Sequence, residues 1–435
     1  MDTSLRAIPA ERFDERSARH LLGRAGYGGT PPEVKQLAAQ GLDAAVDALV
    51  DYPVTPLPDL EPPDLDPDVL RLRTAEERRA IREARRSGDQ DHLDAVNREN
   101  QANRRKDRQM LTELRRWWMQ RMTRTPRPAE DRLTLLWHGH FATSHRSVRD
   151  TYLMYRQHAL LRGHANGNFA DLARGIVRDP AMIKYLNNDR NHKNRPNENL
   201  ARELMELFTL GVGNYSERDI KEGARALTGY GVHDNEFRFR ENQHDPEPKS
   251  ILGRTTNFDG DGFVELLLKQ DACAKFVALK LYDTFVADVG DVYDDVPPAR
   301  RRVIDAIARH LTRAGYELRP VLRTVFRSRH FYDPAVVGKK IKDPTQLVVG
   351  TVRTLGTPLR NRAVVDKAMA AMGQVLFEPP TVDGWDGGRA WINTSTLFVR
   401  QNLTTYLISG RHPSQRKPPN DPGYDPTPLR QELDA

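Results

Sequence analysis

Apolar residues recur every three or four positions along most of the chain, which is the spacing of one face of an α-helix. Short segments rich in Gly, Pro and Asp separate these helical stretches. Alternating apolar and polar residues, the pattern of a strand, mark residues 236–254 and predict a minor β-hairpin there. The pattern therefore predicts a mainly α fold, with a single large helical domain and that hairpin.

Two consecutive helices carry the most regular pattern, one predicted over residues 198–210 and the next over 217–228. Asn197 is the expected N-cap of the first helix. Ser216 and Asp219 have the spacing of a capping box at the start of the second. Each helix has an apolar stripe that must leave water, so both helices are expected to be largely buried.

Polar side chains gather on the side of the 198–210 helix that faces away from its apolar stripe. Positions four apart lie one turn above each other, so these residues form two ridges. The ridges consist of Glu198, Arg202 and Glu206, and of Asn199 and Glu203. The sequence therefore predicts a polar site on this helix.

Composition shifts mark the expected boundaries within the chain. Six prolines between Tyr52 and Asp68 are typical of an extended linker, and the last residues are rich in Pro and polar side chains. We therefore expect an N-terminal helical cap and Pro-rich linker over 1–60, a main helical domain over 61–410, and a disordered tail over 411–435.

Residues 69–124 form a long charged tract that Gly88 should interrupt. Its basic runs could contact phosphates, and Trp117 and Trp118 could stack on bases. Acids interleave with the bases at three- and four-residue spacing, however, which favours a solvated helix face. The expected buried stripe of this helix is Leu111, Leu114, Trp118 and Met122. Because 67 Lys and Arg against 60 Asp and Glu leave a net charge of only +7, we rank nucleic-acid binding last.

Cysteine content and hydropathy limit which classes of protein and of metal site the chain can belong to. The single cysteine, Cys273, excludes an intrachain disulfide and a cysteine metal site, and its apolar surroundings favour a buried structural thiol. No stretch approaches the roughly 18 apolar residues that a membrane span needs, and residues 1–30 lack the apolar run of a signal peptide. The sequence predicts a cytoplasmic protein, unless it is exported together with a partner.

Metal chemistry is first indicated by His138 and His140 in the segment DRLTLLWHGHFATSH, where the predicted helix ends at His138 and stops at Gly139. Gly139 between them can take a positive φ and so turn both imidazoles toward one point. Two histidines from one turn supply half of a tetrahedral metal site. Taken alone, such a pair is more typical of packing or of capping of helix carbonyls.

The distribution of histidines strengthens the metal interpretation. Eight of the 13 lie in one quarter of the chain, namely His138, His140, His145, His158, His164, His192, His233 and His244. The same window carries the acids of the two ridges. It also contains the His244-Asp245 turn, where the Asp could orient the imidazole or bind metal, although His-Asp-Pro is also an ordinary turn.

The first functional hypothesis is a metal-dependent enzyme that performs hydrolysis or group transfer on a polar, anionic substrate. A divalent ion would be held by His138, His140 and Glu198. Glu203 would act as general base, and Arg202 would neutralise developing charge. The expected substrate-binding residues are His244, Asp245, Asn197, Asn199 and Trp385. This hypothesis requires an imidazole close to Glu198 or Glu203, in a pocket covered by the loop 384–391.

Four motifs then identify a resemblance to a known family. The chain resembles the bacterial family catalogued as domain of unknown function 1800, because its motifs follow one another in the same order. They are WHGHFATS, PNENLARELMELFTLGVGNYSERDIKEGARALTGY, HDPEPKSILG and PPTVDGWDGGRAWI. The opening SARHLLGRAGYGGTPPEV is similar to its usual start, so the resemblance covers residues 13–410. Gly139 stands where relatives usually have Asn, and Tyr230 where they usually have Trp. The Gly139 difference removes one polar candidate from the site.

The resemblance implies a mostly helical protein and a possible partner, but no activity. Genes of this family often adjoin one for a secreted protein that resembles alkaline phosphatases and sulfatases. The alternative hypothesis is therefore a non-catalytic partner or chaperone of that secreted protein, in which the polar cluster only fixes helix packing. The enzyme hypothesis is favoured because burying so many titratable groups is costly unless they are paired or bind a ligand.

Overall fold

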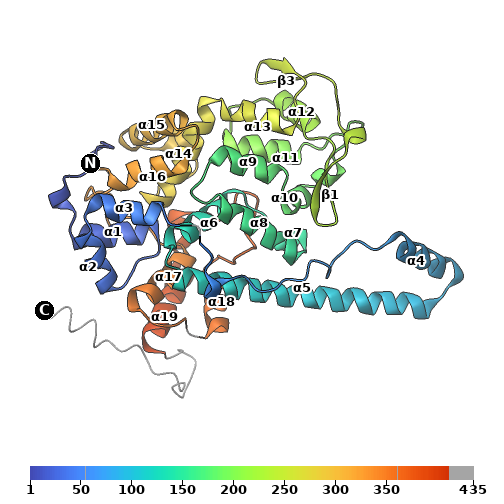
Figure 1. The fold of residues 1–435 in the computed structure, drawn as a ribbon, viewed down its shortest axis with the longest axis horizontal. Helices are drawn as coiled ribbons and strands as arrows, with labels where there is room; N and C mark the ends of the chain where they lie inside the picture. Colours follow the sequence, from blue (N-terminus) through green and yellow to red (C-terminus); the bar gives the residue numbers. More distant parts are fainter. Residues whose placement is uncertain (54, 360, 411–435) are drawn as a thin grey trace.

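The computed structural model describes residues 1–53, 55–359 and 361–410, and Figure 1 shows their arrangement. Helices make up most of this part of the chain, and the strands form two small antiparallel hairpins at one edge. The predicted mainly α fold is confirmed. The predicted disordered tail, 411–435, lies outside the described residues. Within the described residues, no helix combines the length and the apolar character that crossing a membrane requires.

Three short helices open the chain, as the sequence pattern predicts. They are α1 (Glu15–Ala25), α2 (Pro31–Ala39) and α3 (Leu42–Val50). Thr30 and Glu33 form a capping box that fixes the start of α2.

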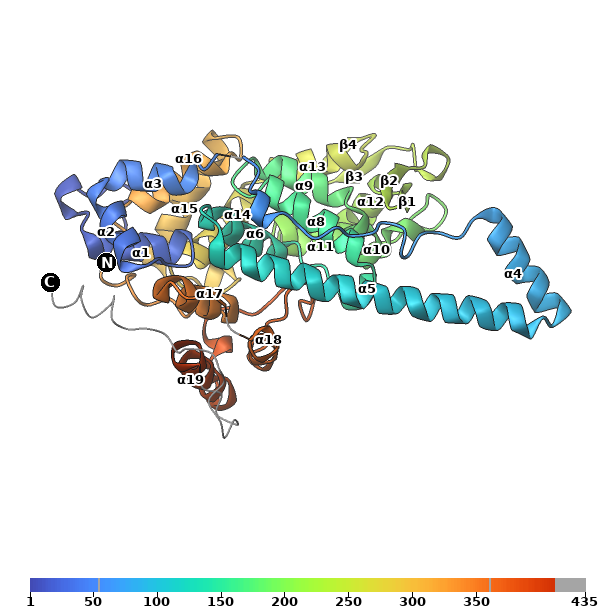
Figure 2. The ribbon, with the colours of Figure 1, turned by 60° about the horizontal axis from the view of Figure 1, so that its bottom comes forward.

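Helices α4 (Ala75–Ser87) and α5 (Gln90–Arg124) form an arm that projects from the body of the molecule (Figures 1 and 2). Gly88, with φ +74°, provides the left-handed residue that ends α4. Trp117 and Trp118 are buried near the C-terminal end of α5. The predicted buried stripe is also confirmed, at Leu111, Leu114, Trp118 and Met122.

Five helices follow in the centre of the molecule. They are α6 (Pro128–His140), α7 (His145–Val148), α8 (Thr151–Gly163), α9 (Phe169–Val177) and α10 (Pro180–Tyr185).

The next helix changes type along its length, which the sequence did not predict. It begins as α11 (Asn199–Glu203) and continues as a π-helix over Leu204–Thr209. Leu210 N donates to Met205 O, five residues back, at 2.8 Å. Segments of π-helix occur often at functional sites because they reposition side chains and carbonyls.

Helix α12 (Glu217–Ala226) starts at the capping box of Ser216 and Asp219, as predicted. The apolar stripes of this helix and the preceding one are buried, as expected. Their buried residues are Leu200, Ala201, Leu204, Met205, Phe208, Ile220, Ala224 and Ala226.

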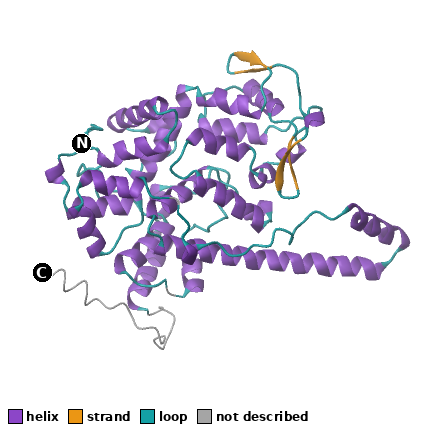
Figure 3. Ribbon diagram, viewed as in Figure 1, coloured by secondary structure: helices purple, strands orange, loops and turns teal. Residues whose placement is uncertain are grey.

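The prediction of a single hairpin over residues 236–254 is wrong, because two separate hairpins form (Figure 3). The strands are β1 (Tyr230–His233), β2 (Glu236–Phe239), β3 (Lys249–Ile251) and β4 (Arg254–Thr256). β1 pairs with β2, and β3 pairs with β4. Asp234 and Asn235 have φ of +49° and +62°, which suits a two-residue hairpin turn. Each strand therefore pairs with its nearest neighbour, and the His244-Asp245 turn lies between the hairpins.

The remaining chain is helical again. Its helices are α13 (Gly260–Leu268), α14 (Asp271–Phe285), α15 (Pro298–Arg313), α16 (Leu318–Arg327), α17 (Pro344–Leu355), α18 (Arg362–Ala371) and α19 (Thr394–Ser409). A single 3-10 turn, Gly388–Trp391, precedes α19.

Two apolar clusters form the core and meet at α6. The larger cluster joins the N-terminal helices to α9 and α11–α16, and it includes Leu133 and Trp137 of α6. The smaller one joins α5 and α8 to α17–α19, and it includes Leu135 of α6. Helix α6 therefore lies at the seam between the clusters, and the polar residues at its C-terminal end lie close to that seam.

Candidate functional site

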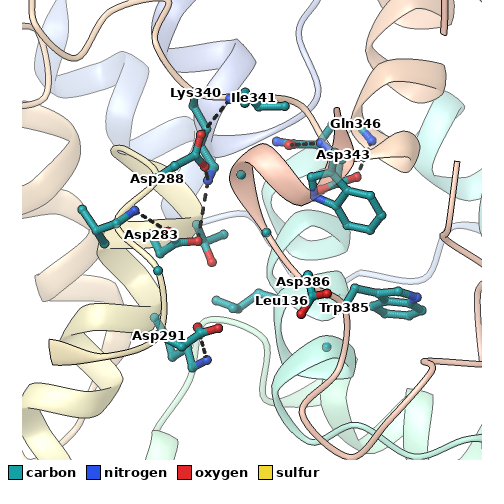
Figure 4. A pocket seen from close by; sticks show the side chains of 18 of the residues that line it. Leu136, Asp283, Asp288, Asp291, Lys340, Ile341, Asp343, Gln346, Trp385 and Asp386 are labelled. Atoms are coloured by element: carbon teal, nitrogen blue, oxygen red, sulfur yellow. Dashed lines mark hydrogen bonds and ion pairs between the residues drawn. The ribbon is translucent and has the colours of Figure 1, made fainter. Parts of the chain in front are cut away.

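A cleft of about 630 Å³ opens at this seam (Figure 4). Its lining comes from α6, the end of α14, residues 288–291, residues 340–346 and the loop 383–391. Segments far apart in the sequence thus converge on one concave surface, which is the usual setting of a ligand site. Trp385 and His140, two residues predicted from the sequence, line this cleft.

The loop that carries Trp385 is docked tightly on the end of α6. Gly384 has φ +89°, and a Cβ on it would lie 2.2 Å from Gly139 O. The Trp385 ring packs edge-on against His138, with 5.4 Å between ring centroids. Only glycine allows this approach at position 384, so the loop forms a fixed wall of the cleft.

A cluster of paired charges lies on the opposite side of the cleft. Lys340 Nζ is 2.5 Å from a carboxylate oxygen of Asp288 and 3.7 Å from one of Asp283. The backbone N–H groups of Ile341 and Val289 donate to Asp288 and Asp283, both at 2.9 Å. The Lys340 side chain is only 7% exposed, so the two carboxylates offset the cost of burying its charge. These ion pairs and hydrogen bonds hold the segments around Asp283, Asp288 and Lys340 together, and so they fix this wall of the cleft.

Other charged side chains of the cleft have no such partner. Arg389, Asp383 and Asp386 form no side-chain hydrogen bond or ion pair with any residue that the structure describes. Arg300 donates to the backbone carbonyl of Asp288 at 3.0 Å but pairs with no described carboxylate. Two cationic and two anionic groups are thus free to meet a ligand.

His140 lines the cleft and carries a buried ring nitrogen without a hydrogen-bond partner among the described residues. Its Nε2 donates to Phe208 O at 3.0 Å, in the last turn of the π-helix where carbonyls lack intrahelical partners. This bond places the proton on Nε2 and leaves Nδ1 unprotonated, buried and without a partner among the described residues. Burial and the nearby Lys280 lower the pKa of His140 to about 3, so the ring is neutral at neutral pH.

His138 makes different contacts and does not line the cleft. Its Nε2 accepts a hydrogen bond from Phe377 N at 3.1 Å. The ring packs against Trp118, Phe377 and Trp385. Burial lowers the pKa of His138 to about 3, so this imidazole is also neutral. Its contacts position the segment that leads into the 383–391 loop.

Arg202 links the two central helices. It lies 3.2 Å from Glu198 on its own helix and 2.7 Å from Glu217 at the start of α12. Glu206, which completes the ridge, instead accepts a hydrogen bond from Tyr215 Oη at 2.5 Å. None of these side chains lines the cleft. A partly exposed ion pair of this kind adds little stability, and Arg202 connects the preceding helix to the start of α12.

Glu203 has an unusual protonation behaviour. Burial, together with the charges of Glu206 and Asp383, raises the pKa of Glu203 to about 7. Glu203 does not line the cleft, but Asp383 does. A carboxyl group that exchanges its proton near neutral pH is therefore coupled electrostatically to a cleft residue.

Replacement of Glu203 by Gln should change the pH dependence of stability. The folded state binds this proton more tightly than the unfolded state, because the pKa is raised from 4.5 to about 7. Wild-type stability should therefore fall as the pH rises through that window. We expect Glu203→Gln to raise the melting temperature at about pH 8 and to leave it nearly unchanged at about pH 5. Melting curves at both pH values test this, and equal shifts would contradict the raised pKa.

The other predicted substrate-binding residues lie outside the cleft and make local contacts. Asn197 Oδ1 accepts from Asn199 N at 3.0 Å, but Glu198 and not Asn197 occupies the N-cap position of α11, so the predicted N-cap is wrong. His244 Nδ1 lies 2.9 Å from Thr228 O. Asp245 pairs with Arg225 of α12, at 2.7 and 3.2 Å. These bonds hold α12 against the connection between the two hairpins.

The predicted metal ligands do not form a recognisable ion site. Among the described residues, no group of three or more His, Cys, Asp or Glu side chains is arranged to hold a metal ion. His138 and His140 each form a hydrogen bond to a backbone group through Nε2, and Glu198 forms an ion pair with Arg202. The donor set His138, His140 and Glu198 therefore does not fit a resident ion in this arrangement.

Several charged residues that line the cleft were not predicted from the sequence, namely Asp283, Asp288, Arg300, Lys340, Asp383, Asp386 and Arg389. These residues lie at helix ends and in connections, where apolar periodicity carries no information about chemistry. One signal was present, since the segment DTFVADVGDVYDD holds five aspartates, one in the last turn of an apolar helix and four directly after it.

Comparisons with known proteins give one result. A family model described as "Protein of unknown function (DUF1800)" matches residues 20–433. No curated protein and no solved structure gives a significant match.

Proposed function

Since the chain belongs to the DUF1800 family of proteins of unknown function, we propose its function from the geometry of the cleft. The protein binds a polar substrate with an anionic group there and catalyses its hydrolysis or a group transfer. The observation that carries this proposal is the presence of unpaired Arg and Asp side chains in a cleft whose other charges are paired. Unpaired charges of both signs suit a ligand that offers both an anion and hydrogen-bonding groups.

Arg300 and Arg389 form the anion-binding end in this proposal. Arg300 Nη1 donates to Asp288 O, and Gly388 lies against the Asp288 side chain, where a Cβ would come within 3.3 Å of Asp288 Cβ. The two arginines therefore lie on segments that meet at Asp288. A guanidinium can bind an oxyanion through two parallel hydrogen bonds, which also orients the substrate.

Asp386 is the proposed acid–base group. Hydrolysis requires a base that takes a proton from the attacking water and an acid that protonates the leaving group. Asp386 lines the cleft and has no partner among the described residues, so its oxygens are available to accept a proton.

Nitrophenyl esters test the proposal, because release of nitrophenolate is coloured. We expect purified protein to hydrolyse at least one of nitrophenyl phosphate, nitrophenyl sulfate and bis-nitrophenyl phosphate. Asp386→Asn should lower kcat on the order of 100-fold or more, since general acid–base catalysis contributes that much. Arg389→Ala should raise KM about tenfold through loss of a charge-assisted bond.

Arg254→Ala is the matched control for Arg389→Ala, because Arg254 is exposed on β4 and does not line the cleft. This variant should behave as wild type. Absence of turnover with all three esters, or equal activity of the Asp386→Asn variant, would remove the proposed activity.

The divalent ion predicted from the sequence stays a prediction, and no step above depends on it. Metal analysis of the purified protein tests it directly. Stoichiometric metal that disappears in a His138→Ala, His140→Ala double variant would support the predicted ligands. Metal-free protein whose melting is unchanged by a chelator would contradict them.

The alternative function, a non-catalytic partner or chaperone of a secreted phosphatase-like or sulfatase-like protein, is supported by one feature. The arm of α4 and α5 projects from the body and leaves its distal surface free (Figure 2). Co-purification with the product of the neighbouring gene, lost on deletion of residues 72–102, would favour this alternative.

A further inference from the structure

A second cavity of about 440 Å³ lies in the loop that connects α10 to α11. It is lined by Asn187, Arg190, His192, Arg195, Pro196 and Asn197, and it shares no lining residue with the cleft. We propose that this cavity binds an oxyanion, namely the phosphate or sulfate group of a small soluble molecule. This proposal is independent of the activity assigned to the cleft.

Hydrogen bonds from buried asparagines hold the loop around the cavity in one conformation. Asn188 Nδ2 donates to Leu227 O and Tyr230 O, both at 3.2 Å. Asn191 Oδ1 accepts from Asn197 N at 2.9 Å. Asn188 and Asn191 are at most 1% exposed. The backbone that carries the cavity's side chains is therefore fixed before any ligand arrives, which lowers the entropic cost of binding.

The cationic side chains of the cavity have no counter-charge. Arg190 and Arg195 form no side-chain hydrogen bond or ion pair within the part of the chain that the structure describes, and no carboxylate lines the cavity. By contrast, Arg225 on the nearby α12 pairs with both Glu222 and Asp245. Arg190 and Arg195 are exposed, so their guanidinium groups are accessible to a ligand, and no carboxylate of the cavity lining competes for them.

His192 provides a further group without a partner. Its Nδ1 is buried and has no hydrogen bond among the described residues. Arg195 N donates to His192 O at 2.8 Å, which closes a tight turn and brings the two residues together at the cavity. A buried polar nitrogen is costly unless a ligand or water satisfies it.

These groups match the chemistry of a tetrahedral oxyanion. Guanidinium groups bind phosphate and sulfate through paired, charge-assisted hydrogen bonds, and they are preferred over lysine for this purpose. A cation would meet two positive charges here, and an uncharged ligand would leave them unpaired.

Calorimetric titration with inorganic phosphate and with sulfate tests the site, with chloride at equal ionic strength as reference. We expect saturable binding of phosphate or sulfate that chloride does not reproduce. A double variant, Arg190→Gln with Arg195→Gln, should weaken binding at least tenfold, since two charge-assisted bonds are lost. Arg254→Gln, an exposed arginine on β4, should bind as wild type.

A charge-preserving double variant, Arg190→Lys with Arg195→Lys, keeps the proposal testable if the first variant fails to fold. It should bind the anion more weakly than wild type, because Lys lacks the bidentate fork. Sedimentation with phosphatidylcholine vesicles, with and without phosphatidylglycerol, separates a soluble ligand from a lipid headgroup. Pelleting that depends on phosphatidylglycerol, without binding of free phosphate or sulfate, would overturn the soluble ligand. Wild-type affinity in both double variants would overturn the site itself.

Discussion

Gly384→Ala should detach the loop 383–391 from the end of α6 and destroy the cleft. The new Cβ would lie 2.2 Å from Gly139 O, and φ at this position is +89°, which alanine rarely adopts. Strain of this kind costs about 1–3 kcal/mol, and a forced displacement of packed neighbours adds a similar amount. We therefore expect the free energy of unfolding to fall by about 2–5 kcal/mol. Denaturant titration followed by circular dichroism measures it.

Detachment of the loop should also be visible in tryptophan emission and in function. Trp385 would leave its contact with His138, so the emission maximum should shift to longer wavelength. Turnover of nitrophenyl esters should be lost, because Asp386 and Arg389 lie on the same loop. Gly387→Ala is the matched control, since its Cβ would meet Asp283 at 3.7 Å, an ordinary contact. Wild-type stability and activity in the Gly384→Ala variant would show that the close approach is not required.

The helical fold could be predicted because local signals and packing agree in most segments. Apolar spacing located the helices, and the capping box of Ser216 and Asp219 fixed the start of α12. The π-helix after Glu203 could not be predicted, because its apolar spacing also suits an α-helix. It is accompanied by the bond from Thr209 Oγ1 to Leu204 O and by the tertiary bond from His140 to Phe208 O.

The candidate site was only partly predictable for a similar reason. His140 and Trp385 belong to conspicuous motifs, and both line the cleft. The partners that complete the cleft, such as Lys340 and Asp283, come from distant segments whose meeting depends on how α14 and α17 pack. Conversely, Glu198 and Arg202 have the spacing of a site but pair with each other on the helix surface. Spacing along one helix identifies which side chains share a face, but it does not say what that face meets.

Arg121→Met should strongly destabilise the core that joins the arm to the body. Arg121 on α5 is 3% exposed, forms an ion pair with Glu130, and lies 3.1 Å from Asp131. Both acids are buried on α6. Removing the guanidinium leaves two buried carboxyl groups without their main partner, which costs about 3–5 kcal/mol. Denaturant titration near neutral pH should show this loss, whereas Arg71→Met, at an exposed pair with Glu77, should change little.

The pH dependence of this loss identifies its cause. Burial raises the pKa of Asp131 to about 6 even though Arg121 acts to lower it. The folded state therefore binds this proton more tightly than the unfolded state, so the carboxyl group reduces stability as the pH rises from about 4 to 6. Without Arg121 the pKa of Asp131 should rise further, and the penalty should continue to grow above that range.

The destabilisation caused by Arg121→Met should consequently be larger at about pH 8 than at about pH 5, where Asp131 is largely protonated. Adding Asp131→Asn to Arg121→Met should restore part of the stability at about pH 8, because the uncompensated charge is gone while the volume is kept. The double variant should also remove much of the difference between the two pH values. A loss of equal size at both pH values would contradict an electrostatic origin and would instead indicate that Arg121 acts through packing alone.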